Sequence, residues 1–71
     1  MPMNQITLHL NGEPCSIEAN ACVSDLLRNN GLENKPVAVE VNHEIIPRSQ
    51  HKQHRLHADD KVEIVHAIGG G

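Results

Sequence analysis

The residues best suited to chemistry stand at the end of the chain, where "VEIVHAIGGG" closes on three glycines. The α-carboxyl group of Gly71 has an ordinary pKa of about 3.3–3.7, so it is ionised at neutral pH and can act as a nucleophile. An extended Gly69-Gly70-Gly71 segment, at about 3.3–3.6 Å per residue, would carry this carboxylate roughly 10 Å beyond the domain. Such a tail would be long enough to enter the active site of another protein. The alternative is a terminal segment without function, because chain ends are commonly poorly ordered.

A second group of candidates is the histidine series His51, His54 and His57, which recur at every third position in "RSQHKQHRLH". Three histidines could supply zinc ligands, but no carboxylate or cysteine stands beside them and no helix is predicted there. The sequence therefore predicts a solvated loop and no metal site. Because the segment also carries three basic residues, a contact with an acidic partner surface is a further possibility.

The two cysteines, Cys15 and Cys22, are not spaced as a C-x-x-C redox or zinc pair, and we expect both to be reduced thiols. Cys15 alternates with polar residues and is expected in the core. Cys22 precedes a predicted helix, where a lowered thiol pKa could make it reactive, but a buried, inert thiol is the favoured interpretation.

Composition excludes several classes of function. With 71 residues the chain is one small domain, in which we do not expect a deep catalytic pocket. A net charge of −3 and the absence of Phe, Tyr and Trp argue against nucleic acid as a partner. No stretch approaches the roughly 20 apolar residues of a membrane helix, and the N-terminus lacks a signal-peptide layout. We therefore expect a cytoplasmic protein that does not bind membranes.

The first half of the chain predicts a hairpin and a helix. Apolar residues alternate over residues 6–10 and 15–19, and Asn11-Gly12 between them is typical of a type I′ turn. Val23, Leu26 and Leu27 then follow helical spacing, which ends at Asn30-Gly31. Cys22 is a poor residue to cap this helix and could cost about 1 kcal/mol of helix stability.

The second half predicts a second hairpin over residues 37–41 and 44–46, turning at Asn42-His43, and a loop over residues 48–57 with one irregular turn or a short strand near Leu56. The closing strand follows Asp59-Asp60, a turn that Asp tolerates with some strain. Both faces of "KVEIVHAI" carry apolar residues, as expected in the middle of a sheet. The sequence thus predicts an α+β domain over residues 1–68 and a flexible glycine tail over residues 69–71.

The same order of elements resembles the β-grasp or ubiquitin-like fold. The segments "NGEP", "LL…NGL", "VAVEVNHEIIPR" and "VEIVHAIGGG" resemble the ThiS family, the sulfur carriers of thiamine biosynthesis, over nearly the whole chain. The resemblance implies a mixed four- to five-stranded sheet with one helix packed across it and an extended glycine tail. Cys22, in place of a capping Thr or Ser, and Asp59-Asp60, in place of a Gly-Asp turn, depart from the family pattern.

The resemblance also implies a function. Gly71 would be adenylated by a ThiF-type adenylating enzyme that uses ATP, and a sulfur donor, either a cysteine desulfurase or a persulfide, would convert it to a thiocarboxylate. Thiazole synthase would then receive the sulfur for the thiazole ring of thiamine. The chain itself would be a protein co-substrate that binds no cofactor and carries a covalent 1-thioglycine at position 71 when charged.

Docking onto these partners is expected near the tail. Ile45, Ile46 and Arg48 are candidates, together with Ala67 and its neighbours His66 and Ile68, because an enzyme that grips the tail must contact this region. Ile45 and Ile46 cannot both face inward in a regular strand, so one of them is expected on the surface. Three alternatives to the thiamine carrier stay open: a molybdopterin-type sulfur carrier, a ubiquitin-like protein modifier, and a non-covalent interaction module.

Overall fold

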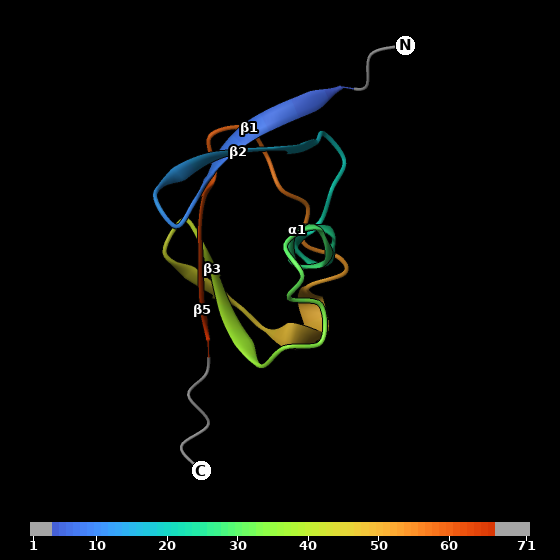
Figure 1. Ribbon diagram of the computed structural model, residues 1–71, viewed down its shortest axis with the longest axis vertical. Coiled ribbons are helices and arrows are strands. Elements are labelled where there is room, and N and C mark those ends of the chain that lie inside the picture. The colour runs from blue at the N-terminus through green and yellow to red at the C-terminus, as the bar shows by residue number, and fades with distance from the viewer. Residues whose placement is uncertain (1–3, 67–71) are drawn as a thin grey trace.

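The first hairpin forms where the alternating pattern predicts it. In the computed structural model, which describes residues 4–66, β1 (Gln5–Leu10) pairs antiparallel with β2 (Glu13–Glu18) (Figure 1). The turn residues Asn11 and Gly12 have φ angles of 50° and 86°, as a type I′ turn requires. Helix α1 (Val23–Asn29) follows and buries Val23, Leu26 and Leu27.

Helix α1 ends at the predicted Asn30-Gly31 signal. Gly31 has a φ of 72°, its N–H donates to the carbonyl of Arg28 at 3.1 Å, and the N–H of Leu32 donates to the carbonyl of Leu27 at 2.8 Å. These two bonds form a Schellman motif, which satisfies carbonyl groups that the last helical turn leaves free. The helix is therefore closed by its own sequence and needs no partner at this end.

The second hairpin joins β3 (Val37–Val41) and β4 (Glu44–Ile46) through Asn42 and His43, both with positive φ. A short 3-10 helix, η1 (Arg48–Gln50), follows Pro47. The last described strand, β5 (Lys61–His66), lies at the centre of the sheet, parallel to β1 and antiparallel to β3. The strand order is β2-β1-β5-β3-β4.

This mixed five-stranded sheet, with one helix on one side, is the predicted α+β β-grasp architecture (Figure 1). Its core lies between the sheet and α1, and the residues without exposed surface include Leu8, Val23, Leu26 and Val39. Within residues 4–66 the single α-helix is seven residues long, and no helix there is long and apolar enough to cross a membrane.

The prediction that the closing strand lies in the middle of the sheet, with apolar residues on both of its faces, is confirmed. β5 is central, and Val62 and Ile64 face the core, but Val65 is 59% exposed. Strand residues alternate between the two faces, and α1 covers one of them. The apolar residue on the other face is therefore available for contact.

The histidine segment is an exposed loop over most of its length, as the sequence predicts, but His51 departs from this prediction. His51 is only 6% exposed, and its Nε2 donates to the carbonyl of Ile46 at 3.0 Å. The carbonyls of His51 and His54 accept the N–H groups of Ser24 and Val23, each at 3.0 Å. The segment thus satisfies the first two N–H groups of α1, and the stability loss expected from Cys22 as a cap is offset by backbone bonds.

Neighbouring contacts complete this join between the loop and the helix. Cys22 and Arg55 form an isolated β-bridge, and the N–H of Leu56 donates to the carbonyl of Ala21 at 2.9 Å. Asp59, with a φ of 68°, adopts the left-handed conformation expected of the turn before β5. Asp60 is buried and accepts the N–H of His57 at 2.8 Å.

Candidate functional site

The geometry of the candidate site begins at the end of β5, from which the chain continues toward the glycines. On one side β3 holds this end, because Ala38 pairs with Val65 and Val37 pairs with His66. On the other side the Asn11 side chain reaches Ile64. Its Oδ1 accepts the Ile64 N–H at 2.9 Å, and its Nδ2 donates to the Ile64 carbonyl at 3.4 Å.

A second asparagine holds the beginning of the same strand. The Asn42 Oδ1 accepts the N–H of Lys61 at 2.9 Å, its Nδ2 donates to Asp60 at 3.0 Å, and its own N–H donates to the Lys61 carbonyl at 2.7 Å. Asn11 and Asn42 are each the first residue of a positive-φ turn. Each hairpin therefore uses its turn to hold β5, with Asn42 bonded to Lys61 at its start and Asn11 bonded to Ile64, two residues before His66.

The predicted tail residues Gly69, Gly70 and Gly71, and the docking candidates Ala67 and Ile68, lie outside the described residues. The boundary between the domain and the tail stays a prediction for the same reason.

The described docking candidates separate into different environments. Ile45 is 70% exposed and Ile46 is 6% exposed, which confirms that one of the pair faces outward and places the Ile46 side chain in the core. The Ile46 side chain is therefore a packing residue, in contrast to its predicted docking role. His66 is exposed at the end of β5, and Arg48 is exposed at the start of η1.

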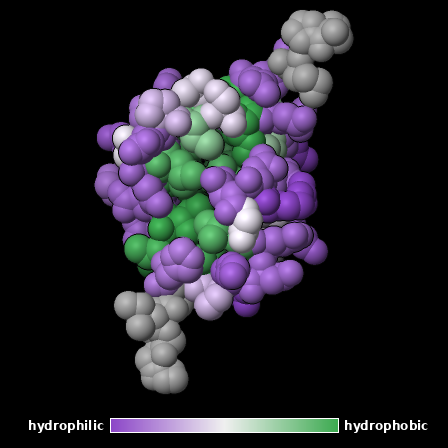
Figure 2. Space-filling view, viewed as in Figure 1, coloured by the Kyte–Doolittle hydropathy of each residue, from purple (hydrophilic) through white to green (hydrophobic). Residues whose placement is uncertain are grey.

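Ile45 and Arg48 do not share a surface. Ile45 lies on the sheet face opposite α1, where the exposed Val65 and Ala38 form a cross-strand pair that our sequence interpretation missed. Apolar residues on both faces of β5 were the available signal. Figure 2 shows hydrophobic side chains reaching an otherwise largely hydrophilic surface over β3 and β5. Arg48, in contrast, lies on the side that carries the helix.

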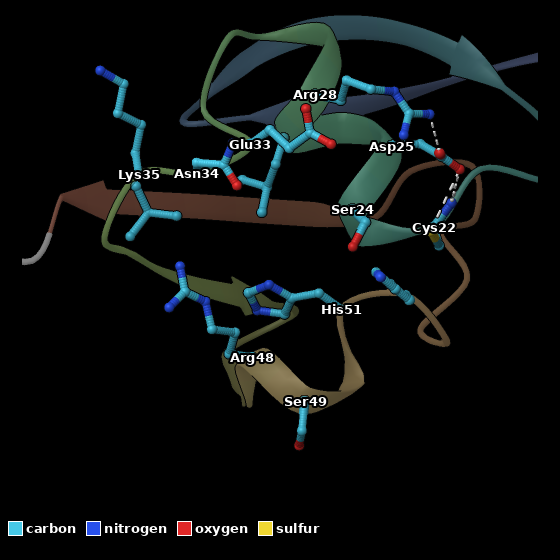
Figure 3. Close-up of a pocket in the computed structure, with 13 residues that line it drawn as sticks. Cys22, Ser24, Asp25, Arg28, Glu33, Asn34, Lys35, Arg48, Ser49 and His51 are labelled. Carbon is cyan, nitrogen blue, oxygen red and sulfur yellow. Dashed lines mark hydrogen bonds and ion pairs between the residues drawn. The ribbon is translucent and has the colours of Figure 1, made fainter.

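A groove of about 660 Å³ opens on that second side, between α1, η1 and residues 33–35 (Figure 3). At one end of it the Asp25 carboxylate accepts the N–H of Cys22 at 3.0 Å and forms an ion pair with Arg28. The Cys22 N–H bond is the main cause that lowers the pKa of Asp25 below its ordinary value. Partial burial acts against this shift, and the Cys22 thiol and Arg28 add to it.

The cysteine and histidine candidates do not form a second site in the described part of the chain. No group of three or more His, Cys, Asp or Glu residues within 4–66 is arranged to hold a metal ion. Both cysteines are free and half-buried, and the Cys22 Sγ lies 3.4 Å from the Asp25 carboxylate. A neighbouring carboxylate does not provide the positive surroundings that activate a thiol.

Comparison with known proteins gives one consistent family. The model of the ThiS family matches residues 8–71. The sulfur carrier protein ThiS of Bacillus subtilis is 42% identical over 65 residues, which cover 90% of this chain and 98% of that protein. The thiazole synthase of Magnetococcus marinus is 42% identical over 64 residues, although the chain spans only 20% of its length.

A solved structure supports the fold. The thiamine biosynthesis protein (ThiS) of Geobacter metallireducens superposes with a TM-score of 0.81 at 28% sequence identity, over 93% of this chain and all of that one.

Proposed function

Because the chain belongs to the ThiS family, we propose that it is a sulfur carrier that supplies sulfur for the thiazole moiety of thiamine. In this role it is a protein substrate of other enzymes and not a catalyst. The observation that carries the proposal is the 42% identity to the Bacillus subtilis sulfur carrier across 98% of that protein.

The described structure supports such a role because β5, the strand that precedes the segment that would react, is firmly held within the domain. β5 is fixed on one flank by β3 and on the other by Asn11, and Ala67 to Gly71 follow it directly in the sequence. A partner that binds the domain would therefore receive those five residues from a defined starting point. Glycine at the last three positions leaves no side chain to obstruct a narrow active site.

We propose the following chemistry at Gly71, acting as the terminal residue. Its carboxylate oxygen attacks the α-phosphate of ATP in a ThiF-type enzyme, and pyrophosphate leaves to give an acyl-adenylate. The terminal sulfur of a persulfide, held by a cysteine desulfurase or another sulfur donor, attacks the acyl carbon, and AMP leaves to give an acyl disulfide. A second thiol, supplied by one of these enzymes, then attacks the donor's sulfur atom, so that the S–S bond to the carrier breaks and a new disulfide forms on the enzyme side. The product is a thiocarboxylate, 1-thioglycine, at position 71. We propose that the reaction takes place in the cytoplasm, where ATP is available.

Thiazole synthase is the proposed acceptor of the sulfur. A segment similar to this chain makes up a fifth of the Magnetococcus marinus protein named thiazole synthase. A shared polypeptide gives two modules a high effective concentration for one another, which would suit a carrier and the enzyme that it supplies.

The first prediction concerns the mass of the protein purified from its native host. Charged carrier should be heavier than uncharged carrier by the difference between one sulfur and one oxygen atom, and fragmentation should place the change at Gly71. Intact-mass spectrometry measures this directly. Branched conjugates on lysine side chains of other proteins would instead indicate a ubiquitin-like modifier. Transfer of the carried sulfur to molybdopterin would indicate a molybdopterin-type sulfur carrier.

A substitution in the tail tests whether the tail is needed for the reaction and not for folding. Gly70→Val should leave the unfolding temperature unchanged and lower the rate of adenylation by about a hundredfold, because a misplaced reacting group loses most of its proximity advantage. Gly70→Ala, with a smaller side chain, should retain more activity. ATP–pyrophosphate exchange with the activating enzyme gives the rates, and a wild-type rate for Gly70→Val would contradict the proposed function.

A further inference from the structure

The groove beside α1 concentrates the positive charge of the molecule. It is lined by four of the six Lys and Arg residues of the chain but by only two of its nine Asp and Glu residues. The groove therefore has a net charge of +2, whereas the rest of the chain has a net charge of −5. The four basic residues, which define what we call the cationic groove, are Arg28, Lys35, Arg48 and Lys52.

Most of this positive charge is not used for folding. Arg28 pairs with Asp25, but within residues 4–66 no ion pair or side-chain hydrogen bond involves Lys35, Arg48 or Lys52. All three are exposed. Charges that neither stabilise the fold nor pair with an acid are free to attract an acidic partner, and they raise the rate of association with it.

The backbone that carries Arg48 is well fixed. The N–H of Gln50 donates to the carbonyl of Pro47 at 2.9 Å, and the N–H of His51 donates to that of Arg48 at 3.1 Å, which forms η1. The buried His51 ring then ties η1 to Ile46. Figure 3 shows the Arg48 side chain pointing from η1 toward residues 33–35. This cation is therefore presented by a fixed element and not by a free loop.

The cationic groove adjoins the end of β5. Val37 lines the groove and pairs with His66, the last described residue before the tail. Lys35 lies only two residues before Val37 in the sequence and lines the same groove. The Lys35 end of the cationic groove therefore lies close to the point in the sequence where the tail begins.

We propose that the cationic groove docks onto an acidic surface of the adenylating enzyme that receives the tail. This inference rests on the proposed function and adds the chemistry of the contact. Rim charges of this kind act mainly on the association rate and on its dependence on salt. The contact should therefore determine how readily the complex forms, with little effect on the chemical step once the tail is bound.

The test compares two double variants with the same change in net charge. Lys35→Glu with Arg48→Glu reverses two groove cations, and Arg55→Glu with Lys61→Glu reverses the two cations outside the groove. Adenylation is measured at several salt concentrations with the full carrier and the activating enzyme. We expect the groove variant to raise KM about tenfold at low salt, to leave kcat within about twofold, and to flatten the salt dependence of KM.

The control variant should change KM by less than about threefold, since it makes the same change in net charge but leaves the four groove cations in place. Equal effects of the two variants, or a wild-type KM for the groove variant, would overturn the inference. If the charge-reversal variant does not fold, Lys35→Gln with Arg48→Gln replaces it in the test. This neutral variant should also raise KM, but by less than the charge reversal does. Tight binding of tripolyphosphate to the groove of the free carrier at matched ionic strength would indicate a small-anion site and also overturn it. If the wild-type chain is not adenylated at all, the proposed function itself fails.

Discussion

At the scale of single residues, the charged carboxylate of Asp25 stabilises the folded protein, and this contribution depends on pH. Its carboxylate accepts the N–H of Cys22, and this bond lowers its pKa in the folded protein. A lowered folded pKa means that the charged form stabilises the native state above the ordinary value of 3.8. This contribution is lost as the pH falls below 3.8 toward the lower folded value.

Asp25→Asn should therefore cost about 0.5–1 kcal/mol of unfolding free energy at neutral pH, because a negative charge near the start of a helix is favourable. The difference between the variant and the wild type should shrink as the pH drops below 3.8. Thermal unfolding of both proteins across the pH range measures it. A difference that is constant with pH would mean that the charge contributes nothing.

The burial of His51 and the capping of α1 at Cys22 are two features that the residue types in the sequence do not predict. Burial of His51 depends on its bond to the carbonyl of Ile46, a backbone group that every residue type provides. The first N–H groups of α1 are likewise satisfied by carbonyls of the loop. Bonds between backbone groups leave no pattern of residue types, so the structural role of this segment could not be predicted from its composition.

At the scale of elements, Asn11 and Asn42 play equivalent roles, because each lies in a hairpin turn and bonds β5 through its side chain. Asn11→Gly and Asn42→Gly both keep the positive φ at the turn, which glycine adopts readily. Each variant loses side-chain bonds to β5 and should lose about 1–2 kcal/mol of stability. Each substitution should nevertheless loosen the β5 backbone only near the residue that the lost side chain bonded.

Amide hydrogen exchange distinguishes the two ends of the strand. Asn11→Gly should accelerate exchange at Ile64 more than at Lys61, and Asn42→Gly should do the reverse, because each side chain bonds one of these two N–H groups. Equal acceleration at both positions in both variants would show that the asparagines stabilise the sheet as a whole and do not hold separate ends.

The elements themselves were largely predictable. Strands with one buried face alternate in the sequence, and the Asn11-Gly12, Asn42-His43 and Asn30-Gly31 pairs mark the ends of elements through their conformational preferences. The position of η1 was not predicted, because three residues of 3-10 helix produce no periodicity. The cationic groove was also not predicted, because it brings together residues from α1, the 33–35 segment and η1 that only the fold makes neighbours.

At the scale of the whole molecule, stability depends on a small aliphatic core. A 71-residue domain has on the order of 4–10 kcal/mol of unfolding free energy. Leu26 is 0% exposed between the helix and the sheet. Leu26→Ala should therefore remove about 2–5 kcal/mol, a large part of the total.

Ile45→Ala is the matched control, since Ile45 is equally large and aliphatic but lies on the open face of the sheet. This substitution should change stability by no more than about 0.5 kcal/mol. Urea unfolding of the two variants gives both values. A large loss for Ile45→Ala would show that the open face is covered in the isolated protein, for example by a second copy of the chain.

The central position of β5 also has a consequence for the order in which the sheet assembles. Each hairpin joins neighbouring segments and can form early, whereas Asn11 and Ile64, which meet at β5, are 53 residues apart in the sequence. Closing so long a loop costs entropy before the contacts can repay it, and folding slows as contacts become less local. We therefore place the rate-limiting barrier at the arrival of β5 between two hairpins that are already formed, so that folding is slower than in a helical bundle of equal length.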